Sequence, residues 1–138
     1  MEWMLMPYRR YADFSGRSQR KEYWMFFLLY TLVLVFGAML IFAGMPNIQA
    51  DPQAVPGVST WIGGALVVLY LLGSIIPAIA VTVRRFHDQD KSGWMWLLNF
   101  IPYVGGLIVF VFMCLDGSHG ANRFGPDPKD PHTADVFG

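Results

Sequence analysis

The sequence predicts an all-α integral membrane protein with about three transmembrane helices and an interfacial N-terminal segment. Hydrophobic residues make up 54% of the 138-residue chain and charged residues only 14%, against roughly 25% in a typical soluble domain. Asp, Glu, Lys and Arg are absent from residues 23–50, 52–83 and 92–115. Tyr or Trp, which prefer the headgroup level, open each expected span. A long helix without charged residues needs lipid around it, so we expect these stretches to lie in a membrane.

Each apolar stretch is long enough to cross a bilayer as a helix. We expect spans at about residues 23–44, 61–83 and 94–115, because about 20 apolar residues cover a hydrocarbon core of about 30 Å. Backbone polar groups inside hydrocarbon must be satisfied within the segment, which favours helices. A secretory signal peptide is a competing interpretation of the first stretch, but its apolar region would be only about 7–15 residues long.

The transmembrane domain, residues 23–115, is expected between two polar segments. Residues 1–22 mix basic and aromatic side chains, which suits a segment that lies on lipid headgroups. Residues 116–138 form a tail that is rich in Gly, Pro and Asp and has no hydrophobic period. We therefore expect this tail to be extended or partly disordered.

The distribution of Lys and Arg predicts the orientation in the membrane. Five basic residues precede the first span, none lies in the first connector, three lie in the second connector and two lie in the tail. This asymmetry places the N-terminus and the second connector in the cytoplasm and the first connector outside. Three full spans would place the tail outside as well.

The third apolar stretch contains helix-breaking residues. Pro102 lies eight residues after its start and is followed by Gly105 and Gly106. Proline removes an intrahelical hydrogen bond and kinks a helix, so a kinked full span is the simplest expectation. The alternative is a re-entrant hairpin, which would return the tail to the cytoplasm and gather every basic motif on one side.

Two basic motifs flank the first two spans on the predicted cytoplasmic side. Arg17, Arg20 and Lys21 precede the first span, and Arg84 and Arg85 follow the second. Each basic residue near an anionic membrane surface contributes about 1 kcal/mol to binding. These five residues are therefore the predicted headgroup-binding residues, and the alternative is that they serve only as the orientation signal.

The second connector also holds weak catalytic candidates. His87 stands beside Asp88 and could act as a general base with its orienting carboxylate, or bind a metal together with Asp90. Glu22 could join such a site. However, adjacent helical residues point about 100° apart, and one His with two Asp falls short of a defined ligand set. A charged turn is the simpler interpretation, so we predict no metal and no cofactor.

The second span carries small residues at four-residue spacing, namely Ser74, Ala78 and Thr82. Small side chains let helices approach closely, so we expect this face to pack against another span or another copy. The spans contain no ionisable Asp, Glu, Lys or Arg, and such residues are the usual mark of a proton or ion route. Their absence argues against a self-contained transporter, although an oligomeric channel stays open.

A third motif, NRFGPDP at residues 122–128, lies in the tail, where Arg123 and Asp127 could pair with groups elsewhere or simply form turns. With the motifs around the first two spans, it resembles the DUF805 family of small bacterial inner-membrane proteins of unknown function. The resemblance implies a bacterial inner membrane and supplies no activity. The matching residues are Phe14, Ser15, Gly16, Arg17, Arg20, Glu22, Tyr23, Trp24, Arg84, Arg85, His87, Asp88, Ser92, Gly93, Trp94, Asn122, Arg123, Phe124 and Gly125.

The predicted function is that of a non-enzymatic membrane protein, a small scaffold or accessory subunit with anionic-lipid contacts. The alternatives are an interfacial enzyme or metal-dependent site built on Glu22, His87 and Asp88, and an oligomeric channel. Expected partners are membrane lipids and a second copy or another membrane protein. The formal net charge of zero offers no basis for a nucleic-acid partner.

Overall fold

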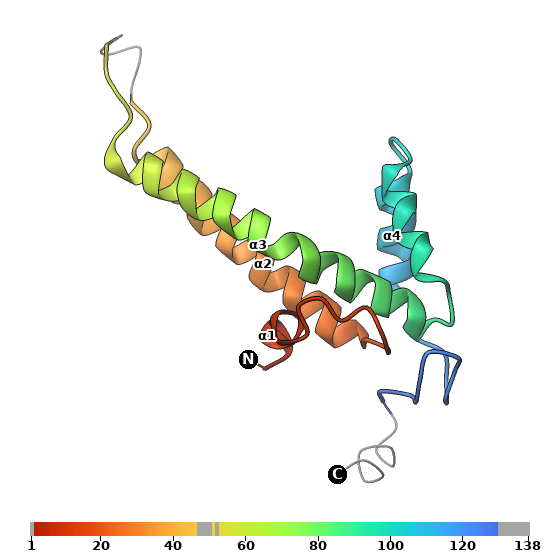
Figure 1. Cartoon of the computed structure of the whole chain (residues 1–138). Coiled ribbons are helices and arrows are strands. Elements are labelled where there is room, and N and C mark those ends of the chain that lie inside the picture. Colours follow the sequence, from red (N-terminus) through yellow and green to blue (C-terminus); the bar gives the residue numbers. More distant parts are fainter. Residues whose placement is uncertain (1, 47–50, 52, 130–138) are drawn as a thin grey trace. The chain divides into compact units, whose positions relative to one another are not determined.

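The computed structural model describes residues 2–46, 51 and 53–129, and this part of the chain is helical without a strand. Figure 1 shows the elements in chain order. The all-helical fold predicted from the sequence is confirmed. The elements are α1 (Glu2–Arg9), α2 (Arg20–Ala43), α3 (Val58–Asp88), the 3-10 helix η1 (Gly93–Phe100) and α4 (Gly105–Cys114).

The helices α2 and α3 are long and apolar enough to cross a membrane. Their most apolar windows have mean hydropathies of 2.6 and 2.5, and only 11% and 28% of these windows are buried inside the protein. A core helix of a soluble protein would be mostly buried, so the low burial favours lipid as the surrounding medium. α4 is apolar but has only 10 residues.

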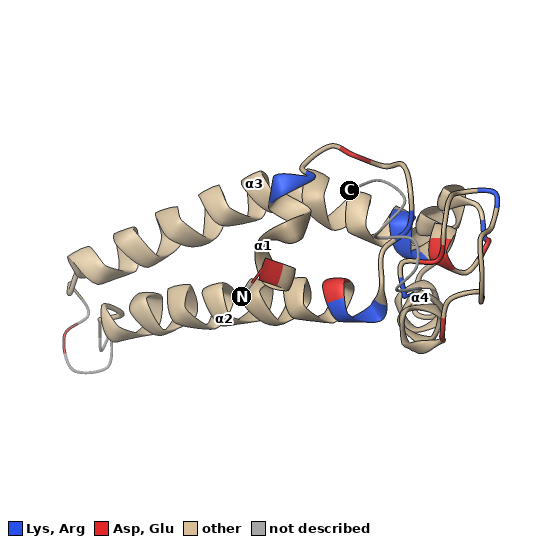
Figure 2. Cartoon of the chain, turned by 90° about the horizontal axis from the view of Figure 1, so that it is seen from below, with Lys and Arg blue, Asp and Glu red and all other residues tan. Residues whose placement is uncertain are grey.

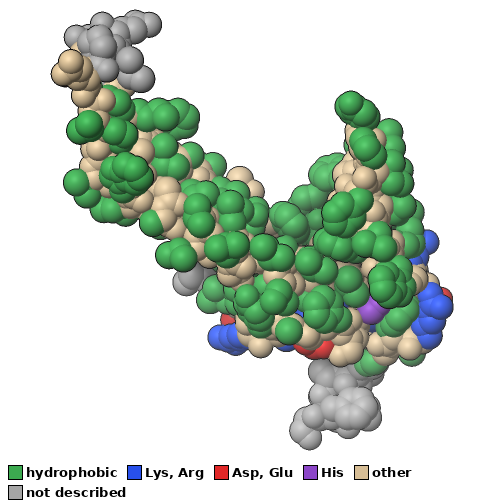
Figure 3. Space-filling model, turned by 45° about the horizontal axis from the view of Figure 1, so that its top comes forward, with side chains coloured by type: hydrophobic (Ala, Val, Ile, Leu, Met, Phe, Trp, Pro, Cys, Tyr) green, Lys and Arg blue, Asp and Glu red, His purple; other side chains and the backbone are tan. Residues whose placement is uncertain are grey.

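The chain divides into two compact units. The apolar unit comprises residues 27–75, and the polar unit comprises residues 1–26 and 76–138. Figure 3 shows hydrophobic side chains over most of the visible surface, with Lys and Arg confined to the polar unit. The nine-residue end of the tail, residues 130–138, lies outside the described residues, so the expectation of disorder there is not addressed.

In the apolar unit, α2 and α3 touch through glycines. A Cβ at Gly63 would lie 2.7 Å from the Gly37 carbonyl oxygen and 2.9 Å from the backbone nitrogen of Ile41. The two backbones are therefore in direct contact, as small residues allow between apolar helices. The Thr60 hydroxyl donates to the Ile41 carbonyl at 3.1 Å, which fixes the end of the pair.

In the polar unit, the third apolar stretch folds back on itself. η1 ends at Phe100, and the chain reverses through Pro102 and Tyr103, whose φ of 67° lies in the left-handed region. A Cβ at Gly105 would lie 1.9 Å from the Leu98 carbonyl oxygen. Only glycine fits at this close approach of η1 and α4, which form the hairpin visible in Figure 1.

This hairpin replaces the single kinked helix that was the simplest expectation for residues 94–115. Ten residues of α-helix are about 15 Å long, about half the thickness of a hydrocarbon core. The second arm also ends where the first begins. The Gln89 side chain donates to the Phe112 carbonyl, and the rings of Phe86 and Phe112 lie 5.8 Å apart. The structure thus shows the alternative, in which the tail returns to the end of α3.

Candidate functional site

The three sequence motifs meet at the last turns of α3. Figure 2 shows that the charged residues of α2 are confined to its first turn, and the other charged residues of the polar unit lie in α1, the connectors, the end of α3 and the tail. Buried side chains from the first two motifs contact one another there, and the tail reaches them through backbone carbonyls and Asp127. We call these buried side chains the ionic cluster, which comprises Arg17, Ser18, Glu22, Arg84, Arg85 and Asp88.

Arg17 connects the first motif to both of the others. Its Nε donates to Asp88 Oδ1 at 2.9 Å, and its two terminal nitrogens donate to the carbonyls of Gly120 at 2.7 Å and Ser118 at 2.6 Å. Its side chain is only 2% exposed. The planar guanidinium presents five donors in a fixed geometry, so a single side chain holds the tail against the end of α3.

Arg84 connects the end of α3 to the segment before α2. Nε donates to the Ser18 hydroxyl at 2.8 Å, one terminal nitrogen donates to Glu22 Oε1 at 2.8 Å and the other to the Asp13 carbonyl at 2.6 Å. The Ser18 amide returns a hydrogen bond to the Arg84 carbonyl at 3.2 Å. A fully buried charge needs this kind of pairing, because losing hydration costs several kcal/mol.

Asp88 is shared between two arginines. One carboxylate oxygen accepts from Arg17, and the other accepts from Arg85, which also donates to the Leu115 carbonyl. Asp127, at 3.9 Å from Arg17, adds a second negative charge on the tail side. The three guanidiniums of the cluster thus face two buried carboxylates within it and the Asp127 carboxylate beside it, so these charges nearly cancel.

Three of the five predicted headgroup-binding residues lie inside this cluster. Arg17, Arg84 and Arg85 are buried and donate to protein acceptors, so they do not splay toward headgroups as the sequence suggested. Arg20 and Lys21, on the first turn of α2, keep access to the surroundings. Burial changes the assignment because the acceptors, mainly backbone carbonyls of distant segments, become visible only in the fold.

The three catalytic candidates do not converge on one cavity. Glu22 is paired with Arg84, and Asp88 with Arg17 and Arg85. His87 belongs to neither pair, because its Nδ1 lies 3.3 Å from the Gly16 carbonyl. Among the described residues, no group of three His, Cys, Asp or Glu side chains could hold a metal ion.

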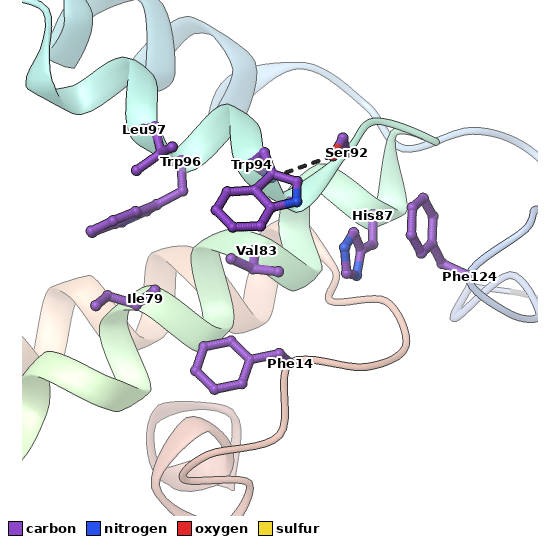
Figure 4. A pocket seen from close by; sticks show the side chains of 10 residues that line it. Phe14, Ile79, Val83, His87, Ser92, Trp94, Trp96, Leu97 and Phe124 are labelled. Atoms are coloured by element: carbon purple, nitrogen blue, oxygen red, sulfur yellow. Dashed lines mark hydrogen bonds between the residues drawn. The ribbon is translucent and has the colours of Figure 1, made fainter.

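His87 instead lines a separate hollow of about 540 Å³ (Figure 4). Its ring stacks on Phe124 with centroids 3.9 Å apart and planes within 5°. From the sequence, Trp94 was expected only to mark the interfacial start of the third span, and Phe124 had no assigned role beyond its place in a motif. The hollow is lined by Phe14, Ile79, Val83, His87, Ser92, Gly93, Trp94, Trp96, Leu97 and Phe124.

Asn122 is another residue beside the hollow to which the sequence analysis assigned no role. Its Nδ2 donates to the His87 carbonyl and to the Ser118 hydroxyl, both at 2.9 Å. Two backbone hydrogen bonds of 3.0 Å between Asn122 and Gly125 close a turn. This turn presents Phe124 to the His87 ring, so the tail motif completes the hollow.

A second depression lies beside the first turn of α2. It has a volume of about 420 Å³ and is lined by Arg20, Lys21, Trp24, Met25 and Cys114. We call it the basic groove. The Arg20 side chain is 43% exposed and pairs with Asp116 at 2.9 Å. Two cations beside a tryptophan and an apolar wall combine the features of a site at a membrane–water interface.

The fold and these sites define a small helical membrane protein whose motif residues are brought together by buried ion pairs. A family model described as a protein of unknown function (DUF805) matches residues 11–126, and the chain belongs to this family. It is thus a small inner-membrane protein of a family without an assigned activity.

Its relatives support this placement. The Escherichia coli K12 inner membrane protein YhaI is 41% identical over 129 residues, which cover 94% of this chain and 97% of YhaI. The inner membrane protein YhaH of the same strain is 42% identical over 130 residues, covering 94% and 98%. The uncharacterized protein YiiR is 24% identical over 147 residues, covering 86% and 87%. No solved structure matches the chain.

Proposed function

We propose that the protein is a non-enzymatic inner-membrane scaffold or accessory subunit that holds anionic lipid headgroups in its basic groove. The observation that carries this proposal is the groove itself, where Arg20 and Lys21 stand beside Trp24. A headgroup phosphate would lie near the two cations while the lipid chain follows the apolar wall. The electrostatic contribution is about 1 kcal/mol for each basic residue.

The non-enzymatic part of the proposal is supported by the state of the carboxylates. Glu22 and Asp88 are buried and accept hydrogen bonds from buried arginines, so their oxygens face protein donors rather than a position open to a substrate. A membrane protein without a catalytic site acts by binding lipids or other proteins. We therefore propose the accessory role and expect an oligomer or complex in native membranes.

The orientation is part of the same proposal. We place the N-terminus, the second connector and the tail in the cytoplasm. The tail contacts the residues before α2 directly through Arg17, which supports a common side. All ten Lys and Arg residues would then lie on the cytoplasmic side of the membrane, and the first connector, on the opposite side, contains none.

Spin-labelled lipids test the groove in reconstituted membranes. We expect the wild type to immobilise spin-labelled phosphatidylglycerol in about two- to fivefold preference over phosphatidylcholine at low salt, with the preference lost at high salt. The double variant Arg20→Gln/Lys21→Gln should show no preference. The matched control Arg123→Gln removes an exposed cation outside the groove and should keep it. Equal association of the two lipids with the wild type would refute the proposal.

Oligomerisation is tested by mass measurement of the protein released from native membrane nanodiscs. We expect a second copy or a partner protein bound to the chain. Exclusive recovery of the monomer would count against the accessory role and leave the lipid contact to be judged by its own experiment.

A further inference from the structure

The hollow beside His87 is built by all three sequence motifs at once. Phe14 comes from the first motif, His87 and Trp94 from the second and Phe124 from the third. The ionic cluster holds these segments together, since Arg17 joins the first segment to the third. The motifs therefore assemble a cavity as well as a set of ion pairs. Its volume of about 540 Å³ is within the range of about 300–1,000 Å³ found for small-molecule sites.

One wall of the hollow is made of apolar and aromatic side chains of the kind that contact lipid. Ile79 and Val83 come from α3, and Trp96 and Leu97 come from η1 of the apolar hairpin (Figure 4). Trp94 at the rim is 79% exposed. In an inner-membrane protein, such an apolar wall with an exposed aromatic rim is accessible to a lipid chain from the side.

The polar end of the hollow presents a hydrogen-bond acceptor. His87 Nδ1 lies 3.3 Å from the Gly16 carbonyl, and a carbonyl can only accept, so Nδ1 carries the proton. In the neutral imidazole, Nε2 is then an acceptor. Nε2 lies beside Gly93, where a Cβ would come within 3.0 Å of it, and no described residue donates to it. A ligand that fits must bring an N–H or O–H donor.

The charge and the other polar groups of the lining residues restrict which hydrogen-bond donor the ligand can carry. No lining residue is an Asp, Glu, Lys or Arg, so the site has no formal charge and suits a ligand that is neutral overall. Phe14 and Trp94 offer aromatic faces, which attract an ammonium group. The Ser92 hydroxyl accepts from the Trp94 amide at 3.4 Å and keeps its own proton to donate to a phosphate oxygen.

We propose that this hollow binds one phosphatidylethanolamine molecule, with its ammonium donating to His87 Nε2 and an acyl chain along Ile79, Val83 and Leu97. The zwitterionic headgroup supplies its own counter-charge. Phosphatidylcholine has an ammonium without an N–H, and phosphatidylglycerol has hydroxyl donors but carries a net charge and no ammonium. The site thus discriminates on hydrogen-bond donation and on net charge. It does not depend on the basic groove.

Competition in one mass spectrum tests this assignment. The full-length protein in nonionic detergent is mixed with equal amounts of phosphatidylethanolamine, phosphatidylcholine and phosphatidylglycerol that share the same acyl chains, and the retained lipids are identified by mass. We expect phosphatidylethanolamine to be retained about tenfold over phosphatidylcholine, since a hydrogen bond to an otherwise unpaired polar group discriminates by about this factor. The preference should persist in concentrated ammonium acetate.

Two variants assign the lipid to the hollow. Ile79→Trp fills it and should lower retained phosphatidylethanolamine at least about fivefold, whereas Leu69→Trp, on an exposed face of α3 in the apolar unit, should not. His87→Phe keeps a ring against Phe124 and removes Nε2. It should keep total lipid retention but bring the ratio of phosphatidylethanolamine to phosphatidylcholine close to one.

The proposal is overturned by equal retention of the two zwitterionic lipids in the wild type, or by undiminished retention in Ile79→Trp when that variant elutes as a folded protein. A preference for phosphatidylglycerol that disappears in Arg20→Gln/Lys21→Gln and at high salt would also overturn it, because that lipid would then occupy the groove. This last outcome would leave the proposed function standing, so the two ideas fail separately.

Discussion

The apolar unit and the polar unit differ in the contacts that stabilise each of them internally. All ten Lys and Arg residues belong to the polar unit, and Asp51 is the one charged residue of the apolar unit. In the apolar unit two helix backbones touch at Gly37 and Gly63, and lipid can solvate the rest. In the polar unit guanidiniums are fully buried and depend on named acceptors. The first mode requires only small side chains, whereas the second requires particular residues at particular positions.

The largest effect concerns the side of the tail, because it is all or none. Arg17 holds the carbonyls of Ser118 and Gly120, so the tail must share the side of the N-terminal segment. A fluorescent protein that matures only in the cytoplasm, fused after Gly138, should be bright. A periplasm-dependent reporter at the same site should be silent. The reverse pair of results would place the tail outside; together with a cytoplasmic N-terminus this would mean a full third span, and the ionic cluster could not then exist.

The next largest effect is expected within the ionic cluster. Arg84→Met leaves Glu22 buried without its partner, and breaking a buried pair in this way costs about 3–5 kcal/mol. We expect a strongly lowered midpoint of thermal unfolding in detergent, or loss of the protein from the membrane. Arg123→Met, which removes a 60%-exposed arginine, is the control and should change the midpoint little.

A second substitution distinguishes lost pairing from lost packing. Glu22→Leu added to Arg84→Met removes the stranded charge, so the double variant should be more stable than Arg84→Met alone. A double variant as unstable as the single one would show that Arg84 acts mainly through Ser18 and Asp13. The polar unit would then differ from the apolar unit by these hydrogen bonds between distant segments rather than by its ion pairs.

A smaller effect is expected in the apolar unit. Gly63→Ala places a Cβ 2.7 Å from the Gly37 carbonyl oxygen, so the helices must separate, at a cost of about 1–3 kcal/mol. Gly64→Ala places its Cβ in open space and is the matched control in the next residue of the same helix. It should be neutral or slightly stabilising, because alanine favours a helix over glycine. Equal melting points for the two variants would show that the backbones do not touch.

These differences also explain how much of the structure could be predicted from the sequence. The long uncharged stretches are enough to predict the helices, because charge-free segments have only one suitable solvent. The motifs marked which segments matter, but not that Arg17 and Arg84 face inward. Their acceptors are backbone carbonyls such as those of Gly120 and Asp13, and every residue has one, so no pattern identifies them.

The hairpin shows the same limit in the apolar part of the sequence. Pro102 and the glycines after it allowed either a kink or a reversal, since both use the same breaker residues. The deciding fact is the close approach of Gly105 to the Leu98 carbonyl, a contact that only the folded chain defines. His87 was noticed for its chemistry, yet its partner is an aromatic ring 37 residues further on.

The smallest effect is expected at the edge of the polar unit, where a charge is solvated rather than buried. The Ser15 side chain, with Arg10, lowers the pKa of Asp13 to about 2 from an ordinary value of 3.8. A lowered pKa means that this carboxylate stabilises the fold above about pH 4, and that the contribution is lost as the pH falls through 2. The Ser15 amide donates to Asp13 Oδ1 at 3.0 Å, so its NMR shift should titrate with a midpoint near 2. Asp13→Asn should abolish that titration, and a midpoint near 3.8 in the wild type would show that the turn does not hold the carboxylate. Because Asp13 is partly exposed, Asp13→Asn should lower overall stability much less than Arg84→Met does. The difference between the two variants distinguishes a solvated charge from a buried one within the same unit.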